Sequence, residues 1–240
     1  MKTKMVFYGD SIIKGKTWQE NAPKPIDTKK NFVEYCRHCL DSFGIEVISK
    51  GVNGRISKQA CLELEDEVLK LKPNYVVLEI GGNDSNFNWK EVSDYPDKDH
   101  KPVATPTEFR DNLISILDKL EQEKITVILL TPPPLAEEKY FSLLKGYFGD
   151  SISPHIQQKG GIANFHKQYV DVIREVAEER ELFLIDIYQE FENIPDYKVD
   201  LIGKDGLHPS EKGYKLMAQI FMKSIGYLFL QNASQFALIS

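Results

Sequence analysis

Residues near the two ends of the chain could together transfer an acyl group. Ser11 closes a Gly-Asp-Ser sequence that follows a short apolar run. A serine hydroxyl is a poor nucleophile until a neighbouring base takes its proton. His208 could be that base, and Asp205, three residues earlier, could hold the imidazole in place. These residue types predict acyl-transfer chemistry if the fold brings positions 11 and 208 together.

Acyl transfer also needs hydrogen-bond donors for the negative oxygen that develops on the substrate. Gly54 has no side chain, so its backbone N–H could approach a substrate closely, and Asn83 could add a side-chain amide. With the N–H of Ser11, these groups would provide three donors. The alternative is that Asn83 and Asp205 are only turn formers and that Gly54 only allows a positive φ angle.

Other polar residues have structural interpretations. Asp10 lies beside the candidate nucleophile, but a carboxylate in a strand-to-helix turn often accepts backbone hydrogen bonds, and we interpret it as a brace. His208 and Pro209 could alternatively only start the last helix. The remaining histidines are interpreted as surface or core residues: His38, His100, His155 and His166.

The candidate residues follow apolar runs that have the length of buried strands. Five such runs occur, at residues 5–8, 45–49, 75–80, 125–130 and 182–187, and Glu79 is the charged residue in the third. Helical patterns lie between them, one of them after the capping box at residues 105–108. This alternation predicts an α/β fold with a five-stranded parallel sheet and helices on both faces. We expect one domain over residues 1–240, with a site at the carboxyl ends of the strands.

Two long polar stretches interrupt this pattern, at about residues 85–104 and 135–160. Loops often carry binding residues, and both stretches contain many aromatic side chains. The predicted substrate-binding residues are Asp84, Phe87, Trp89 and Tyr140. Some of these rings could alternatively only pin the stretches to the body of the protein.

Composition argues against several partners. Thirty basic and 36 acidic residues give a formal net charge of −6, and no basic cluster is interleaved with aromatic residues, so no nucleic acid is expected. Only four apolar residues follow the basic start, too few for a signal peptide or a membrane span. We therefore expect a soluble, cytoplasmic protein without stable membrane anchoring that acts on a small molecule.

The three cysteines do not indicate a metal or redox site. Cys36 and Cys39 form a Cys-x-x-Cys sequence, but no second pair completes a zinc site. Both fall within an amphipathic helix expected from about Thr28 to Phe43, and we predict that both thiols are buried. The last helix is expected to end at about Leu228.

Four sequence blocks, in order, resemble those of the SGNH/GDSL hydrolase family. They are Gly-Asp-Ser at 9–11, the glycine at 54 after an asparagine, Gly-Gly-Asn-Asp at 81–84 and Asp-Gly-Leu-His-Pro at 205–209. The Thr-Pro-Pro-Pro sequence at 131–134 also resembles a turn found after the fourth strand in many members. The blocks span nearly the whole chain, and their shared order makes the resemblance specific.

The resemblance implies a flavodoxin-like, three-layer α/β/α sandwich that hydrolyses esters without a metal or an organic cofactor. By this resemblance, Ser11 is the nucleophile, His208 is the general base and acid, and Asp205 is the partner of the histidine. Gly54 and Asn83 are implied as oxyanion donors. The two long stretches exceed what a minimal member needs, so the substrate class stays open.

The main functional hypothesis is a serine esterase that acts on short-chain acyl, acetyl-carbohydrate or lipid esters through an acyl-enzyme on Ser11. Because the base must be neutral, activity should fall at acidic pH with one titrating group. One alternative is an acyltransferase that uses the same residues. Another is a non-enzymatic, flavodoxin-like module that binds phosphate or flavin, although residues 11–15 lack the glycine spacing of phosphate-binding loops.

Overall fold

Five parallel strands form the central sheet of the computed structural model, which describes residues 2–19 and 21–237, with side chains to residue 226. The strands are β1 (Thr3–Gly9), β4 (Ile45–Gly51), β5 (Tyr75–Glu79), β6 (Thr126–Leu130) and β7 (Phe183–Ile185). Their order across the sheet is β4-β1-β5-β6-β7, and every neighbouring pair is parallel. The predicted sheet is confirmed, and its strand order is that of flavodoxin-like folds.

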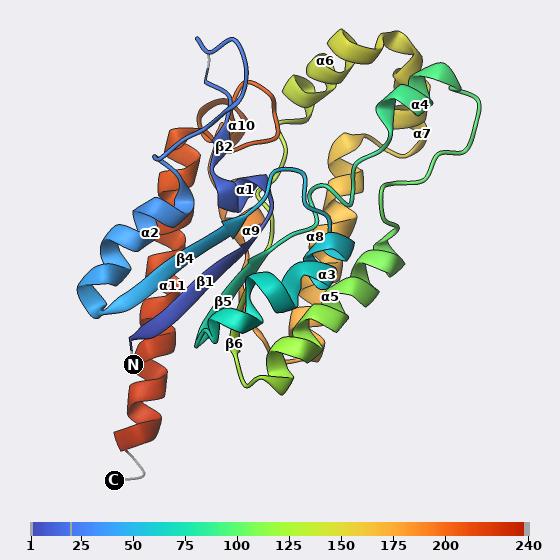
Figure 1. The fold of residues 1–240 in the computed structure, drawn as a ribbon. Coiled ribbons are helices and arrows are strands. Elements are labelled where there is room, and N and C mark those ends of the chain that lie inside the picture. The colour runs from blue at the N-terminus through green and yellow to red at the C-terminus, as the bar shows by residue number, and fades with distance from the viewer. Residues whose placement is uncertain (1, 20, 238–240) are drawn as a thin grey trace.

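Helices cover both faces of this sheet and give the three layers seen in Figure 1. One face packs against α1 (Ser11–Lys14), α2 (Phe32–Leu40), α9 (Ile187–Glu192) and α11 (Glu211–Ala237). The other face packs against α3 (Ser57–Glu67), α5 (Pro106–Gln122) and α8 (Ile162–Glu179). The three-layer α/β/α sandwich is therefore confirmed.

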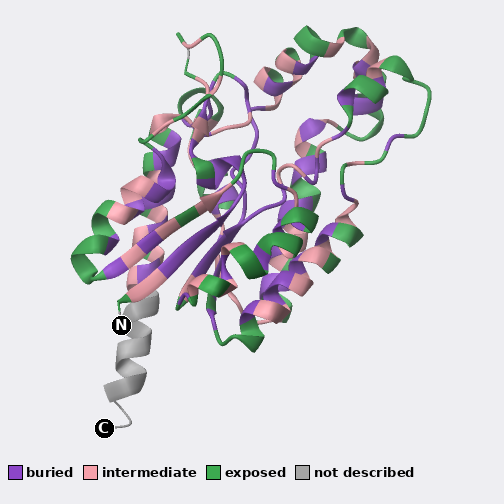
Figure 2. Ribbon diagram, in the orientation of Figure 1, coloured by how far each residue is buried: buried purple, intermediate pink, exposed green. Residues whose placement is uncertain are grey.

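Alternate residues of β1 enter two separate hydrophobic cores. Met5 and Phe7 belong to the core under α2 and α11, whereas Val6 and Tyr8 belong to the core under α3, α5 and α8. All four side chains are fully buried, and Figure 2 shows the inner strands as a buried layer between the helices. Burial on both faces explains why this strand is continuously apolar rather than alternating.

Side-chain caps set the first residues of two helices. The Oγ1 of Thr105 accepts the N–H of Glu108 at 3.3 Å, and the Glu108 carboxylate accepts the N–H of Thr105 at 2.8 Å, so the predicted capping box of α5 is confirmed. Helix α2 begins later than expected, at Phe32, because the Asn31 side chain caps it by accepting the N–H of Glu34 at 3.0 Å.

Two helix predictions are wrong in detail. Cys36 is buried, but Cys39 is exposed, because three residues along an α-helix turn the side chain roughly 60° away from the buried stripe. The last helix continues past Leu228 to Ala237, since no glycine or proline interrupts residues 227–237. Residues 238–240 lie outside the described residues.

The two long stretches form short helices beyond the carboxyl ends of the strands, at the upper right of Figure 1. They contain α4 (Trp89–Asp94), α6 (Glu137–Phe148), η3 (Asp150–Ile152) and α7 (Ser153–Gln158). Their apolar side chains pack together and against α8 as a third core. In the described ranges, no helix has the length and apolar character needed to cross a membrane.

Smaller elements complete the chain. The two-residue strands β2 (Lys16–Thr17) and β3 (Ile26–Asp27) pair in antiparallel fashion. Single turns of helix occur at η1 (Asp41–Phe43), η2 (Leu69–Leu71) and α10 (Tyr197–Asp200). None of them interrupts the layered arrangement.

Two glycines let α1 turn back across the edge of the sheet. Gly9 and Gly51 lie opposite each other at the ends of β1 and β4. A Cβ atom on Gly51 would lie 2.2 Å from the backbone nitrogen of Lys14, and one on Gly9 would lie 2.1 Å from the carbonyl oxygen of Glu79. Because glycine has no side chain at either position, the turn that carries Ser11 can lie directly on the strand ends.

Candidate active site

Ser11 begins α1 at the point where the strand order reverses. The chain passes from β1 outward to β4 on one side and then to β5 on the other, which opens a crevice outside the strand ends. Ser11 is 7% exposed in this crevice. The Oδ1 atom of Asp10 accepts the N–H of Ile12 at 2.8 Å and caps the helix, so Asp10 braces the turn as expected.

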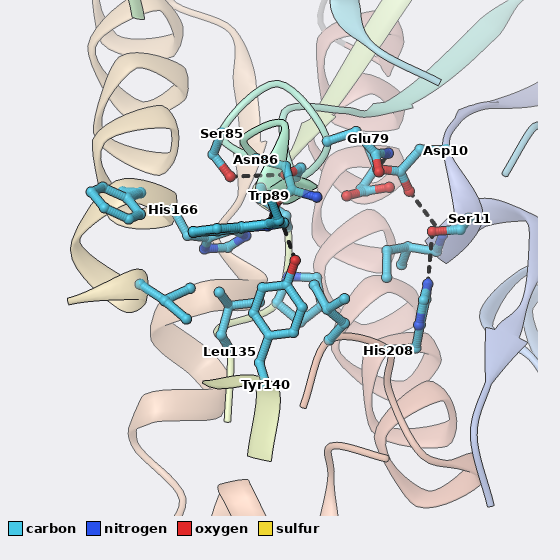
Figure 3. Close-up of a pocket in the computed structure, with 18 residues that line it drawn as sticks. Asp10, Ser11, Glu79, Ser85, Asn86, Trp89, Leu135, Tyr140, His166 and His208 are labelled. Carbon is cyan, nitrogen blue, oxygen red and sulfur yellow. Dashed lines mark hydrogen bonds between the residues drawn. The ribbon is translucent and has the colours of Figure 1, made fainter. Parts of the chain in front are cut away.

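Hydrogen bonds connect Ser11 to His208, 197 positions later, and on to Asp205. The Oγ atom of Ser11 lies 3.0 Å from Nε2 of His208, and Figure 3 shows the hydroxyl facing the ring. The Nδ1 atom of His208 lies 2.7 Å from Oδ2 of Asp205. Oδ1 of Asp205 accepts the N–H groups of Leu207 and His208, each at 3.0 Å. The fold thus brings together the three residues predicted to react.

The partners of Asp205 determine its charge. Burial alone would raise the pKa of this carboxyl, which is 2% exposed, but the His208 ring and the two backbone N–H groups outweigh burial and hold the pKa below its ordinary value. Asp205 is therefore ionised at neutral pH. An anion at Nδ1 keeps a proton on that nitrogen, which leaves Nε2 able to accept the proton of Ser11.

The turn between Asp205 and His208 rests on the start of α6. Gly206 has a φ of +74°, and a Cβ atom there would lie 2.4 Å from the backbone nitrogen of Tyr140 and 2.6 Å from the carbonyl oxygen of Ala136. The Gly206 carbonyl also accepts the N–H of Ala136 at 2.9 Å. The long stretch at residues 135–160 therefore supports the turn that carries His208 and also forms part of the wall of the crevice.

Two of the three predicted oxyanion donors, Asn83 and Gly54, lie in different surroundings. Asn83 lines the crevice, but its Nδ2 already donates to Oδ2 of Asp10 and to the carbonyl oxygen of Arg55, each at 3.0 Å. Gly54 is exposed, has a φ of +79° and is absent from the lining of the crevice. Their role as donors stays a prediction, and for Asn83 it requires that one of these bonds be released or shared.

A cavity of about 80 Å³ lies between Ser11 and the two long stretches. Asn86 organises its far wall: the side-chain oxygen accepts hydrogen bonds from Nε1 of Trp89 at 2.6 Å and from the hydroxyl of Tyr140 at 3.1 Å (Figure 3). Trp89 and Tyr140 therefore line the cavity, where a bound group would contact them. Their role in substrate binding stays a prediction.

Comparison with known proteins places this site in a family. Residues 7–216, which include Ser11, Asn83 and His208, match the GDSL-like lipase/acylhydrolase family. The chain belongs to this family. The resemblance carried by the four sequence blocks is thus confirmed, and the protein is an ester-hydrolysing enzyme.

Relatives of this GDSL-family enzyme cover nearly its whole length. It is 24% identical to an acetylxylan esterase of Geobacillus stearothermophilus over 235 residues, 95% of this chain and 96% of the relative. It is also 24% identical over 222 residues to the uncharacterized lipoprotein YqeF of Bacillus subtilis, 89% of this chain and 85% of the relative. A lipase/acylhydrolase structure from Enterococcus faecalis matches with a TM-score of 0.68 at 25% identity, covering 93% of this chain and 95% of that one.

Two residues predicted to bind substrate in this GDSL-family enzyme lie outside the pocket. Asp84 is fully buried, and its carboxylate accepts the hydroxyl of Ser57 at 2.5 Å and the backbone N–H of Ser57 at 3.0 Å. It therefore ties α3 to the loop after β5. Phe87 is buried in the third core, between the rings of Trp89 and Phe165, because its loop packs on α8.

Glu79, Asn86 and His166 line the crevice but were not predicted from the sequence as site residues. Glu79 had a signal, since it is charged within an otherwise apolar strand. His166 had none: it follows Phe165 on the buried side of α8 and stacks on the ring of Tyr188. Within the described ranges, no group of three or more His, Cys, Asp or Glu side chains has an arrangement that could hold a metal ion.

Proposed function

We propose that this enzyme hydrolyses esters of short acyl groups, acetyl esters in particular, through an acyl-enzyme on Ser11. The observation that carries the proposal is the hydrogen-bond chain from Ser11 through His208 to Asp205. It has the order of nucleophile, base and orienting carboxylate that hydrolysis by a serine requires. The similarity to an acetylxylan esterase over 95% of the chain supports acetyl as the acyl group.

In the first half-reaction, Oγ of Ser11 attacks the carbonyl carbon of the ester while Nε2 of His208 accepts the hydroxyl proton. The negative carbonyl oxygen would be bound by the N–H groups of Ser11 and Gly54 and by the amide of Asn83. When the tetrahedral intermediate collapses, the alcohol leaves with the proton from His208. Asp205 stays ionised throughout and stabilises the imidazolium.

In the second half-reaction, water attacks the acyl group and gives a proton to His208. The bond between the acyl carbon and Oγ of Ser11 then breaks, and the serine oxygen takes the proton back. The carboxylic acid leaves and the free enzyme is restored. An alcohol in place of water would instead give acyl transfer, so water must reach the acyl-enzyme for hydrolysis to prevail.

The size of the cavity supports a short acyl group. Its volume of about 80 Å³ is about half of the roughly 150 Å³ of an engineered cavity that holds benzene. Trp89 and Tyr140 close its far side, and both are held by Asn86. A short acyl group therefore fits the cavity, whereas a long acyl chain would have to extend out of its opening or displace these rings.

The test is hydrolysis of nitrophenyl esters, from acetate to long acyl chains, by the wild type and by Ser11→Ala. We expect the highest kcat/KM with acetate and a loss of at least about a thousandfold in Ser11→Ala. Ser42→Ala, at an exposed serine after α2, is the matched control and should keep full activity. Equal turnover by the wild type and Ser11→Ala would exclude Ser11 as the nucleophile, and an optimum at long chains would exclude the short-acyl assignment.

A further inference from the structure

A buried acid at the end of β5 has no part in the mechanism above. Glu79 lines the crevice, lies opposite Gly9 in the sheet and is 0% exposed. Among the described residues, no backbone N–H, side-chain N–H or hydroxyl group donates a hydrogen bond to either of its carboxyl oxygens. An ionised carboxylate that is buried without donors or a cation is very costly, so the protonation state of Glu79 needs an explanation.

The group that faces Glu79 is the carboxyl of Asp10, and Figure 3 shows the two side by side. Two carboxylates cannot hydrogen bond to each other unless one carries a proton. Burial, followed by the charge of Asp10, raises the pKa of Glu79 well above its ordinary value. Burial raises the pKa of Asp10 only to about 6, because the hydrogen bond from Ile12, the charge of His208 and the hydrogen bond from Glu79 oppose it. Of the two carboxyls, Glu79 is therefore the one that holds the proton.

Charged or titratable groups from other elements do not replace this contact. Asp84, in the loop after β5, adds a negative charge that raises the pKa of Asp10. Tyr214 of α11 is within electrostatic range of both carboxyls, but its hydroxyl donates to the carbonyl oxygen of Lys16 at 2.6 Å. In the described part of the chain, Asp10 is thus the partner available to a protonated Glu79.

We propose that Glu79 is a positioning residue of this active site, whose neutral carboxyl donates a hydrogen bond to Asp10. Asp10 then holds two parts of the site, since its Oδ1 accepts the N–H of Ile12 at 2.8 Å and its Oδ2 accepts Nδ2 of Asn83 at 3.0 Å. The first bond fixes the turn that carries Ser11, and the second fixes the amide proposed to bind the oxyanion. The inference rests on the proposed function of Ser11 and Asn83.

The hydrogen bond from Glu79 matters because it keeps Asp10 ionised. Without this donor, the anionic form of Asp10 loses a stabilising contact, so Asp10 takes up a proton at higher pH. A neutral carboxyl accepts hydrogen bonds less strongly than a carboxylate, and the Asn83 amide is then held less firmly. Glutamine at position 79 would keep an N–H donor but could not ionise, whereas leucine has a similar volume and no donor.

The experiment compares Glu79→Gln with Glu79→Leu, measuring kcat and KM for nitrophenyl acetate across the pH range. Glu79→Gln should keep kcat within about threefold and retain the wild-type decline at acidic pH. Glu79→Leu should lose about tenfold to a hundredfold in kcat, because a whole oxyanion donor contributes about a hundredfold to a thousandfold. Its KM should change by less than about threefold, and its acidic decline should move to higher pH.

A wild-type kcat and pH profile in Glu79→Leu would overturn the proposal, as would equal losses in both variants. If Glu79→Leu does not fold, infrared spectroscopy decides: a neutral carboxyl band in the wild type at neutral pH, missing from Glu79→Gln, supports the proposal, and no such band in the wild type overturns it. Failure of the proposed function is recognised separately, because the wild type and Ser11→Ala would then hydrolyse the ester at the same rate.

Discussion

His208 can accept the proton of Ser11 only as a neutral imidazole, and a second group beside the nucleophile also titrates on the acid side. Burial raises the pKa of Asp10 to about 6, and Asp10 must be ionised to hold its turn most firmly. The sequence suggested one titrating group, whereas the structure indicates two.

We therefore predict that protonation of Asp10, at about pH 6, adds a second proton to the decline of kcat/KM for nitrophenyl acetate on the acid side. On a logarithmic plot, the slope of the acidic limb should approach two. The measurement is the pH dependence of kcat/KM in buffers of constant ionic strength. A limb with a slope of one throughout would show that protonation of Asp10 does not impair the reaction.

His166 gives a prediction about stability. Its ring is 4% exposed, Nδ1 has no hydrogen-bond partner among the described residues, and burial lowers the pKa from 6.5 to about 4. The unfolded chain binds a proton on His166 at higher pH than the native protein does. The contribution of the neutral ring to the free energy of unfolding is therefore fully present above pH 6.5 and is lost as the pH falls toward 4. The loss over this window is about 3 kcal/mol.

Phenylalanine at position 166 would keep the stacking on Tyr188 but would not titrate. When the pH is lowered from near neutral to about 4, the free energy of unfolding should decrease less in His166→Phe than in the wild type. We predict that the two decreases differ by about 3 kcal/mol. Urea unfolding at the two pH values measures this difference. Parallel losses in both proteins would contradict a buried, neutral His166.

At the level of elements, the two long stretches act together. The Oγ atom of Ser93 in α4 donates to the carbonyl oxygen of Phe148 at the end of α6, at 2.7 Å. Asn86, before α4, holds Trp89 of α4 and Tyr140 of α6. Each stretch alone is too short to bury its apolar side chains, so the wall of the pocket depends on their contact.

We predict that Trp89→Ala changes the acyl preference, because it removes the largest ring of that wall. The ratio of kcat/KM for nitrophenyl butyrate to that for the acetate should rise about tenfold, since one methylene group in an apolar pocket is worth about tenfold or more. Trp18→Ala is the matched control: the side chain is half-buried and absent from the cavity lining, so the ratio should not change. An unaltered chain-length profile in Trp89→Ala would count against a binding role for this ring.

At the scale of the whole molecule, the reversal of strand order at β1 assembles the site. Ser11 follows β1, Asn83 follows β5, and His208 lies in the connection between β7 and α11, yet all three line one crevice. Parallel strands place these connections at the same edge of the sheet. Any change that lifts α1 from this edge should therefore disrupt the whole site.

Gly51→Ala is such a change. The added Cβ atom would lie 2.2 Å from the backbone nitrogen of Lys14, which cannot move without moving α1. We predict a loss of at least about 2 kcal/mol in stability and a decrease in kcat of tenfold or more. Gly146→Ala is the control, because its Cβ meets no neighbour and alanine favours a helix, so stability should rise slightly. Wild-type stability and activity in Gly51→Ala would refute this account of the turn.

The sequence alone was sufficient for features that depend on near neighbours. Continuous apolar runs predicted the five strands, and the capping box predicted the start of α5 at Pro106. Ser11, Asp205 and His208 could be nominated because each lies just after a strand or in a turn with chemically suitable neighbours. Periodicity and capping are set by contacts within a few residues, so they can be read without the fold.

Contacts between distant segments were decided only by the tertiary structure. Asn83 and Asp84 are adjacent, yet the first lines the crevice and the second is buried against Ser57 of α3. Likewise, Glu79 faces Asp10 only because β1 and β5 are neighbours in the sheet. Which polar group meets which partner depends on packing between elements far apart in the chain, and local spacing carries no information about that packing.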